Sequence, residues 1–255
     1  MLDLVLLSFL LISAAIFSLI FNVTLLTSIF LFFAMPSLWL TLRLGKRSIR
    51  LVIFSLICGL GPTLIIDPIA NFSRIWLVKS IFAFRLLGVP LEQFLWGFFF
   101  VYLITTFYEY FFPIKSKSIL NKKMFLLILM FLFAYIFTSL IKLYFPLVLF
   151  KYFYFFSGVL IFMLPLFVVC LKFPKIRGSV FKTAIYFLFL DSFYEFVALK
   201  LGLWTFSGDT NTYLVTYKFL NTAFPLEEFL YFSILASSAI LSYYFLFDIS
   251  EDKLT

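Results

Sequence analysis

The sequence predicts an all-α integral membrane protein with about eight transmembrane helices, arranged as two tandem four-helix repeats. Three observations lead to this prediction. Hydrophobic residues make up 64% of the chain and charged residues only 13%, against about a quarter in soluble proteins. Several uncharged stretches approach or exceed the roughly 20 residues that a membrane-spanning helix needs. A short Pro-Leu-Glu motif also occurs in each half of the chain.

The first two helices are expected within Leu4–Leu42, which is uncharged and long enough for two spans that turn near Asn22–Thr24. Two other helices, at about Leu91–Phe111 and Val180–Leu199, must carry charged residues within them. A β-barrel would instead show short segments of alternating polarity. The remaining four helices are predicted from the uncharged stretches Leu51–Ile66, Met124–Ile141, Tyr152–Leu171 and Phe229–Phe247.

Basic residues predict how these helices are oriented. With eight spans, the loops after the second, fourth and sixth helices lie on the same side as both termini. These loops are basic, so the positive-inside rule makes that side cytoplasmic. The start of the chain lacks the basic region of a secretory signal, and the first segment is interpreted as a permanent helix of a multi-pass cell-membrane protein. The basic residues concerned are Arg43, Lys46, Arg47, Arg50, Lys115, Lys117, Lys122, Lys123, Lys172, Lys175, Arg177 and Lys182.

Composition also excludes several classes of site. The chain has no histidine, which excludes histidine metal sites, bis-histidine haem and a histidine acid or base. It has no G-x-G-x-x-G motif, which excludes a dinucleotide fold. Cys58 and Cys170 lie inside predicted helices and are interpreted as buried packing residues. The net charge of +8 follows the loops and forms no basic stripe, so we expect no nucleic-acid partner.

The two halves of the chain share a motif. Residues 90–95 (PLEQFL) and 225–230 (PLEEFL) are identical at five of six positions, at an offset of 135. Upstream of each copy lies an acid near a helix end and then a tryptophan, Asp67 with Trp76 and Asp191 with Trp204. We therefore predict a first repeat at residues 1–114, a basic cytoplasmic linker at 115–123 and a second repeat at 124–255. An even number of helices per repeat gives both repeats the same orientation.

Acidic residues are the candidates for chemistry, because a charged side chain at a bilayer centre costs about 2.5–3.5 kcal/mol on insertion scales. The sequence keeps seven in or near its predicted spans. Asp191 and Glu195 are four residues apart and share one helix face. The acids concerned are Asp67, Glu92, Glu109, Asp191, Glu195, Glu227 and Glu228.

These acids also have structural interpretations. A glutamate that follows a proline in the first turn of a helix can simply stabilise that helix end. Asp191 and Glu195 could form a buried ion pair with Lys200 or Arg85. Glu109 could lie at the membrane interface.

A carboxyl group held away from water favours its neutral form, and a neutral carboxyl beside an ionised one is an acid–base pair. Such a pair in an apolar, aromatic cavity suits chemistry on a hydrocarbon. It can protonate an alkene and then remove a different proton from the carbocation, without a nucleophile, a metal or a redox cofactor.

These features resemble the lycopene cyclase domain family, the integral-membrane, heterodimer-type carotenoid cyclases. The resemblance rests on the duplicated Pro-Leu-Glu turn, on the upstream acid and tryptophan, and on Tyr108 and Glu109 late in the fourth helix. It covers nearly the whole chain, in the form in which two domains are fused.

The second half matches the family turn fully at Pro225, Leu226, Glu227, Glu228 and Phe229. The first half matches it at Pro90, Leu91, Glu92 and Phe94, but Gln93 stands where the family pattern usually has a second glutamate. The candidate catalytic residues are Glu227, Glu228, Glu92, Asp191 and Asp67. The candidate substrate-binding residues are Pro90, Trp76, Trp204, Pro225 and Phe229.

The resemblance implies a redox-neutral cyclisation of the ψ-ends of lycopene to β-rings, through γ-carotene to β-carotene, without cofactor or metal. The expected partners are lycopene or a related carotenoid, the lipid bilayer and other carotenoid-pathway enzymes. Two alternatives stay open: ε-cyclisation or hydration of the same ψ-end, and a small membrane transporter. A prenyltransferase would need aspartate-rich motifs in both halves, and only Asp191–Glu195 comes close.

Overall fold

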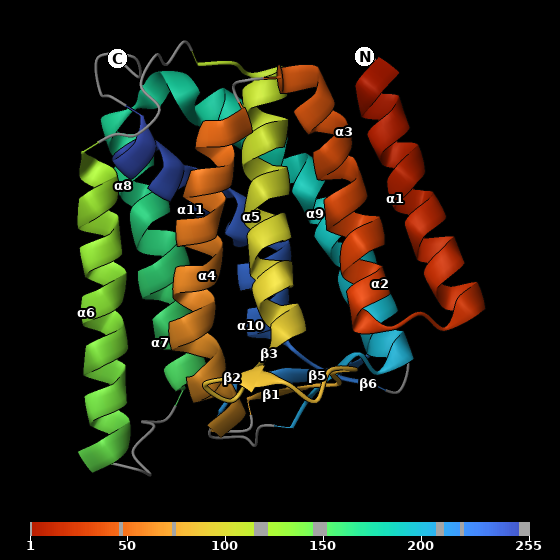
Figure 1. Cartoon of the computed structure of the whole chain (residues 1–255), viewed down its shortest axis with the longest axis vertical. Coiled ribbons are helices and arrows are strands. Elements are labelled where there is room, and N and C mark those ends of the chain that lie inside the picture. Colours follow the sequence, from red (N-terminus) through yellow and green to blue (C-terminus); the bar gives the residue numbers. More distant parts are fainter. Residues whose placement is uncertain are drawn as a thin grey trace.

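A computed structural model describes residues 2–45, 48–72, 75–114, 122–144, 152–207, 212–219 and 222–249. Eight helical segments within these ranges stand side by side in one bundle (Figure 1). The predicted linker, apart from its last residues, lies outside the described part of the chain.

The first four helical segments form where the sequence predicts them. The turn between the first two lies at Asn22, which has a left-handed φ of 46°, and Thr24 caps the next helix by accepting a hydrogen bond from the Thr27 N–H. The fully apolar sequence before and after this turn explains why two helices form here. The segments are α1 (Leu2–Phe21), α2 with η1 and α3 (Leu25–Ile29, Phe30–Ala34 and Met35–Leu44), α4 (Ser48–Phe72) and α5 (Leu91–Phe111).

The other four segments also match the predicted helices. Pro225 precedes the last of them, and its extended backbone allows the helix to start at the next residue. Of all eight segments, three contain π-helical stretches: η1 lies in the second segment, η3 in the sixth, and η5 and η6 in the last. Such stretches are uncommon and often occur at functional sites. The segments are α6 (Lys123–Tyr144), α7–η3–α8 (Phe153–Gly158, Val159–Met163 and Leu164–Lys172), η4 with α9 (Pro174–Ile176 and Arg177–Leu201), and α10–η5–α11–η6 (Leu226–Glu228, Phe229–Leu235, Ala236–Tyr243 and Tyr244–Asp248).

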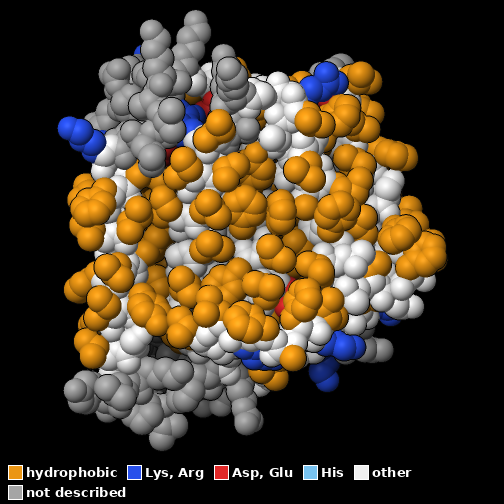
Figure 2. All heavy atoms as spheres, in the orientation of Figure 1, with side chains coloured by type: hydrophobic (Ala, Val, Ile, Leu, Met, Phe, Trp, Pro, Cys, Tyr) orange, Lys and Arg blue, Asp and Glu red, His pale blue; other side chains and the backbone are white. Residues whose placement is uncertain are grey.

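Seven of these segments are long and apolar enough to cross a membrane. The segment containing α9 is not among them, because charged residues such as Asp191, Glu195 and Lys200 interrupt its apolar sequence. It nevertheless packs within the bundle, against α1, α5, η5 and α11. Hydrophobic side chains cover the middle of the visible face, and basic side chains gather toward its two ends (Figure 2).

The connections at one end of the bundle contain strands, which the sequence analysis did not predict. β1 (Trp76–Val78) pairs with β4 (Trp204–Phe206), β2 (Arg85–Leu86) pairs with β3 (Val89–Pro90), and β5 (Thr216–Phe219) pairs with β6 (Thr222–Pro225), all antiparallel. They lie together below the helices in Figure 1. The two hairpins end at the prolines that start α5 and α10, so each repeated Pro-Leu-Glu motif joins a strand to a helix.

Two glycines bring α4 and α5 close together. A Cβ atom placed on Gly97 would lie 2.7 Å from the Gly59 carbonyl oxygen, and one placed on Gly59 would lie 2.6 Å from the Gly97 carbonyl oxygen. Small residues let membrane helices approach through their backbones. Asp67 at the end of α4 is thereby fixed relative to the start of α5.

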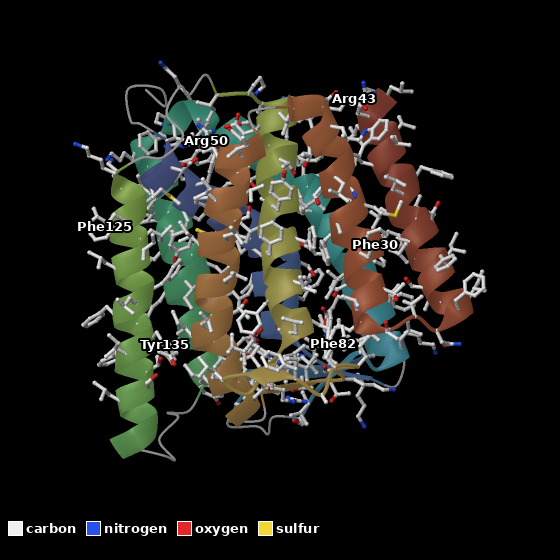
Figure 3. All side chains as sticks on the ribbon, in the orientation of Figure 1. Phe30, Arg43, Arg50, Phe82, Phe125 and Tyr135 are labelled. Atoms are coloured by element: carbon white, nitrogen blue, oxygen red, sulfur yellow. The ribbon has the colours of Figure 1, made fainter. Side chains whose placement is uncertain are left out.

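A buried ionic cluster joins the helices at the opposite end of the bundle. The Arg50 guanidinium on α4 lies 2.9 Å from the Glu109 carboxylate on α5 and 3.1 Å from the Asp248 carboxylate in η6. The Tyr244 hydroxyl donates a hydrogen bond to Glu109. Figure 3 shows Arg43 and Arg50 at this end and Phe82 at the other end, beside the strands. The cluster therefore ties the first half of the chain to the second.

Candidate functional site

The β1–β4 ladder brings the two upstream tryptophans together at the end of the bundle where the strands lie. Leu77 lies opposite Thr205, Trp76 opposite Phe206, and Val78 opposite Trp204. The register is symmetric, since each tryptophan pairs with the residue two positions after the other. The ladder is thus the structural centre of the candidate site.

In the first half, Asp67 lies in the last turns of α4 and is 7% exposed. The Gln93 side-chain amide donates a hydrogen bond of 3.3 Å to its carboxylate, and the Trp76 indole lies within hydrogen-bonding reach. The sequence analysis placed the end of this helix at Ile66. The structure continues α4 to Phe72, and this extension brings Asp67 beside Gln93 on α5.

In the second half, Glu195 on α9 takes the matching position. The Trp204 indole donates a hydrogen bond of 3.0 Å to its Oε1 atom. The Glu195 carboxyl also interacts electrostatically with Glu228, whose carboxylate accepts a hydrogen bond from the Tyr154 hydroxyl on α7. Both halves thus place an acid, a tryptophan and residue 93 or 228 near one another; Gln93 donates to Asp67, whereas the described residues show no hydrogen bond between Glu228 and Glu195.

The spacing of these residues corrects one part of the sequence interpretation. Asp67 precedes Trp76 by nine residues, and Glu195 precedes Trp204 by nine residues. The sequence analysis instead paired Asp67 with Asp191. Glu195 makes the contacts that correspond to those of Asp67, so the stretch from acid to tryptophan has one length in both halves. The equal spacing was the sequence signal for this pairing.

The first glutamate of each repeated motif contacts the outer loops. Glu92 is fully buried and accepts hydrogen bonds from the Ser80 hydroxyl at 2.8 Å and from the Ile81 N–H at 2.8 Å. Glu227 is 2% exposed and accepts one from the Leu214 N–H. Both glutamates thus satisfy donors in the chain that precedes their motif. The adjacent acids Glu227 and Glu228 have different partners.

Asp191 lies one helical turn from Glu195, and its side chain has no exposed surface. Neither of its carboxyl oxygens has a hydrogen-bond partner among the described residues. The ion pair with Lys200 or Arg85 that the sequence left open is not formed: the salt bridges of the described residues join Arg43 to Asp3 and Arg50 to Glu109 and Asp248.

Aromatic rings surround the second-half acids. The Tyr154 ring lies 5.8 Å from the Trp76 ring, 6.1 Å from Tyr213 and 6.1 Å from Tyr231, measured between centroids. The Tyr194 ring lies 5.2 Å from the Trp204 ring. Tyr154, Tyr194, Tyr213 and Tyr231 were not among the predicted site residues, because tyrosines at helical spacing in such an aromatic chain carry no distinguishing pattern.

The predicted substrate-binding residues divide into three groups. Trp76 and Trp204 are partly buried and contact the site as described above. Pro90 and Pro225 are buried at the strand–helix junctions. Phe229, at the start of η5, is 38% exposed and is the most exposed of the five.

The site consists of carboxyl groups, amide and hydroxyl donors and aromatic rings. Within the described residues, no group of three or more histidine, cysteine, aspartate or glutamate side chains is placed to hold a metal ion. Comparisons with protein-family models, with curated proteins and with solved structures found no match to this chain. The fold and site therefore define a helical membrane protein with neighbouring buried and half-buried acids beside an aromatic strand ladder.

Proposed function

We propose that this protein is a cofactor-independent carotenoid cyclase of the lycopene cyclase domain type, which closes the ψ-ends of lycopene into β-rings. The observation that carries the proposal is the placement of Glu195 and Glu228 on the contacting segments α9 and α10–η5, where Trp204 and Tyr154 hold the two acids among aromatic rings. Two carboxyl groups in such surroundings supply an acid and a base without any other group. The substrate class is inferred from the resemblance of the two Pro-Leu-Glu turns to the lycopene cyclase domain family.

The reaction balances without an oxidant or reductant. One carboxyl of the pair gives its proton to the terminal double bond of a ψ-end, which forms a tertiary carbocation. The electrons of the neighbouring alkene attack this cation and close the six-membered ring. The other carboxylate removes a proton from the ring carbon next to the new cation, and a double bond forms there. Substrate and product have the same atoms and the same oxidation state.

The aromatic rings have a role in this sequence. A carbocation over the face of a tryptophan or tyrosine ring is attracted by the negative charge of that face. Trp204, Tyr154 and Tyr231 lie around the acid pair and suit this role. They also leave few groups that could add to the cation, which favours proton loss over hydration.

The other candidate acids take supporting roles. Glu92 and Glu227 hold the outer loops against the starts of α5 and α10. Asp67 forms with Gln93 a carboxyl–carboxamide copy of the pair. Because a carboxamide cannot give up or take a proton at neutral pH, the first half orients the substrate and the second half carries out the chemistry.

We further propose that the chain contains two repeats, residues 1–114 and 124–255, with four spans each, so that α9 also crosses the membrane. The symmetric register of β1 and β4, the matching contacts of Asp67 and Glu195, and the matching hairpins before Pro90 and Pro225 support the duplication. The basic loops support cytoplasmic termini and a strand ladder on the opposite side.

Helices that are unwound near the middle of the bundle would instead indicate a transporter. The described spans pass through π-helical stretches but stay helical from end to end. This leaves ring closure as the function that the site supports best.

The test is expression in a bacterial host that accumulates lycopene, followed by chromatography of its pigments. We expect γ-carotene and β-carotene in cells with the wild-type chain. Glu228→Gln should lower their yield about a hundredfold or more, the usual loss for an essential acid or base. Asp3→Asn is the matched control, because Asp3 is paired with Arg43 at the other end of the bundle. Unchanged lycopene, with the protein present in the membrane, would contradict the proposal.

A further inference from the structure

The acid and the base of the Glu195–Glu228 pair can be distinguished through a third carboxyl group. Asp191 is fully buried on α9, one turn before Glu195. Side chains four residues apart on a helix have Cβ atoms about 5–6 Å apart, which lets two carboxyl groups meet directly or through one water molecule. The two groups also interact electrostatically.

The free atoms of these two groups are complementary. Glu195 uses Oε1 to accept the hydrogen bond of Trp204, whereas its buried Oε2 has no partner among the described residues. Both oxygens of Asp191 are likewise buried and unpartnered. An ionised Asp191 would lie beside other acids without a compensating cation, at high cost. A neutral Asp191 has an O–H that can fill the free acceptor of Glu195.

The first half of the chain provides an independent observation on the second group. Gln93 stands at the position of Glu228, and its amide N–H donates to the Asp67 carboxylate, which stands at the position of Glu195. A glutamine has the shape and the donor of a protonated glutamate. In the first half, residue 93 therefore donates and the upstream acid accepts, which suggests the same direction for Glu228 toward Glu195, although in the described residues Glu228 itself accepts a hydrogen bond from Tyr154.

We propose that Asp191 is a positioning residue, whose neutral carboxyl donates a hydrogen bond to Glu195 and so sets Glu195 as the ionised proton acceptor and Glu228 as the proton donor. Hydrogen-bond donation to a carboxylate favours its charged form. Glu195 then has two donors, Trp204 and Asp191, on its two oxygens, whereas the described residues give Glu228 one donor, the Tyr154 hydroxyl. The assignment of proton donor and proton acceptor rests on the proposed function, whereas the neutral state of Asp191 does not depend on it.

Three variants at one position test the role of Asp191. Asp191→Asn keeps a donor of the same size, so it should retain ring formation within a few fold of wild type. Asp191→Leu removes the donor and should lower ring formation about tenfold to a hundredfold, the loss expected for one hydrogen bond to a charged group. Asp191→Glu keeps the neutral group and tests the site if Asp191→Asn fails to fold. A complete loss in folded Asp191→Asn, or full activity in Asp191→Leu, would overturn the proposal.

Infrared spectroscopy of the purified protein tests the neutral carboxyl directly and needs no substrate. Asp191 should contribute a protonated-carboxyl C=O component to the wild-type spectrum, in addition to that of Glu228, and this component should be lost in Asp191→Asn and in Asp191→Leu and shifted in Asp191→Glu. Asp3→Asn should retain the component, because Asp3 is ion-paired. Protonated-carboxyl absorption of undiminished intensity in Asp191→Asn would refute the neutral Asp191. If the component behaves as expected but lycopene is not converted, the proposed function fails and the state assigned to Asp191 stands.

Discussion

Arg50→Gln is expected to be strongly destabilising, because it removes the cation that two buried carboxylates share. Arg50 is 11% exposed, and Glu109 and Asp248 are 3% and 1% exposed. The glutamine side chain is shorter than that of arginine and carries no charge, so it cannot form an ion pair with either carboxylate. Both acids then stay buried, with the Tyr244 hydroxyl still donating to Glu109.

Breaking a buried ion pair by removing one partner costs about 3–5 kcal/mol. For a chain of this size, each kcal/mol lowers the melting temperature by about 2–4 °C, which gives a decrease of roughly 6–20 °C. The triple variant Arg50→Gln, Glu109→Gln and Asp248→Asn should recover much of this loss, because no charge then remains unpaired. The decrease measures how firmly η6 is joined to α4 and α5.

The measurement is thermal unfolding of the purified protein in detergent, followed by circular dichroism. Lys182→Gln is the matched control, since Lys182 is exposed and a surface change of this kind costs within about 0.5 kcal/mol. If Arg50→Gln and Lys182→Gln melt at the same temperature, the cluster does not hold the two halves together and the reasoning is refuted.

Three further predictions concern packing, topology and the two halves. Gly97→Ala should destabilise the protein by about 1–3 kcal/mol, because its Cβ atom would meet the Gly59 carbonyl. Gly178→Ala is the control, because a Cβ atom at Gly178 meets nothing within 4 Å, and equal melting temperatures of the two variants would argue against the close α4–α5 contact. In a cysteine-free background, an impermeant thiol reagent added outside cells should label Lys79→Cys and not Gly178→Cys, and the reverse pattern would invert the proposed orientation. Gln93→Ala should lower β-carotene formation far less than Glu228→Gln, and similar losses would mean that both halves take part equally in proton transfer.

Most of the fold could be predicted from the sequence, because membrane helices are specified by length and polarity alone. The turn at Asn22 lies at the polar residues inside the first apolar stretch, α5 starts at Leu91 directly after Pro90, and α9, predicted to end near Leu199, ends at Leu201. The strands could not be predicted in the same way. β1 and β4 are three residues each, and they are stabilised by a partner from the other half of the chain. A pairing between segments more than a hundred residues apart leaves no local pattern.

The candidate site was predictable in kind but not in its pairing. Every acid singled out in the sequence is buried or partly buried in the structure. Which acids face one another depends on tertiary contacts, such as the approach of α10 and η5 to α9. Tyr154 is a further example, because it reaches Glu228 from a helix more than seventy residues away.

The adjacent glutamates show why helix geometry decides the pairing. Successive residues on an α-helix point about 100° apart, since a turn contains 3.6 residues. Glu227 and Glu228 therefore cannot face the same partner. Glu227 accepts from the loop N–H of Leu214, and Glu228 lies with Tyr154 and Glu195. The first half shows the same division: Glu92 accepts a hydrogen bond from its loop, and Gln93 donates one to Asp67. The loop contact is a glutamate in both halves, whereas the second position is Gln93 in one half and Glu228 in the other, so under the proposed function only the second half keeps a titrating group there.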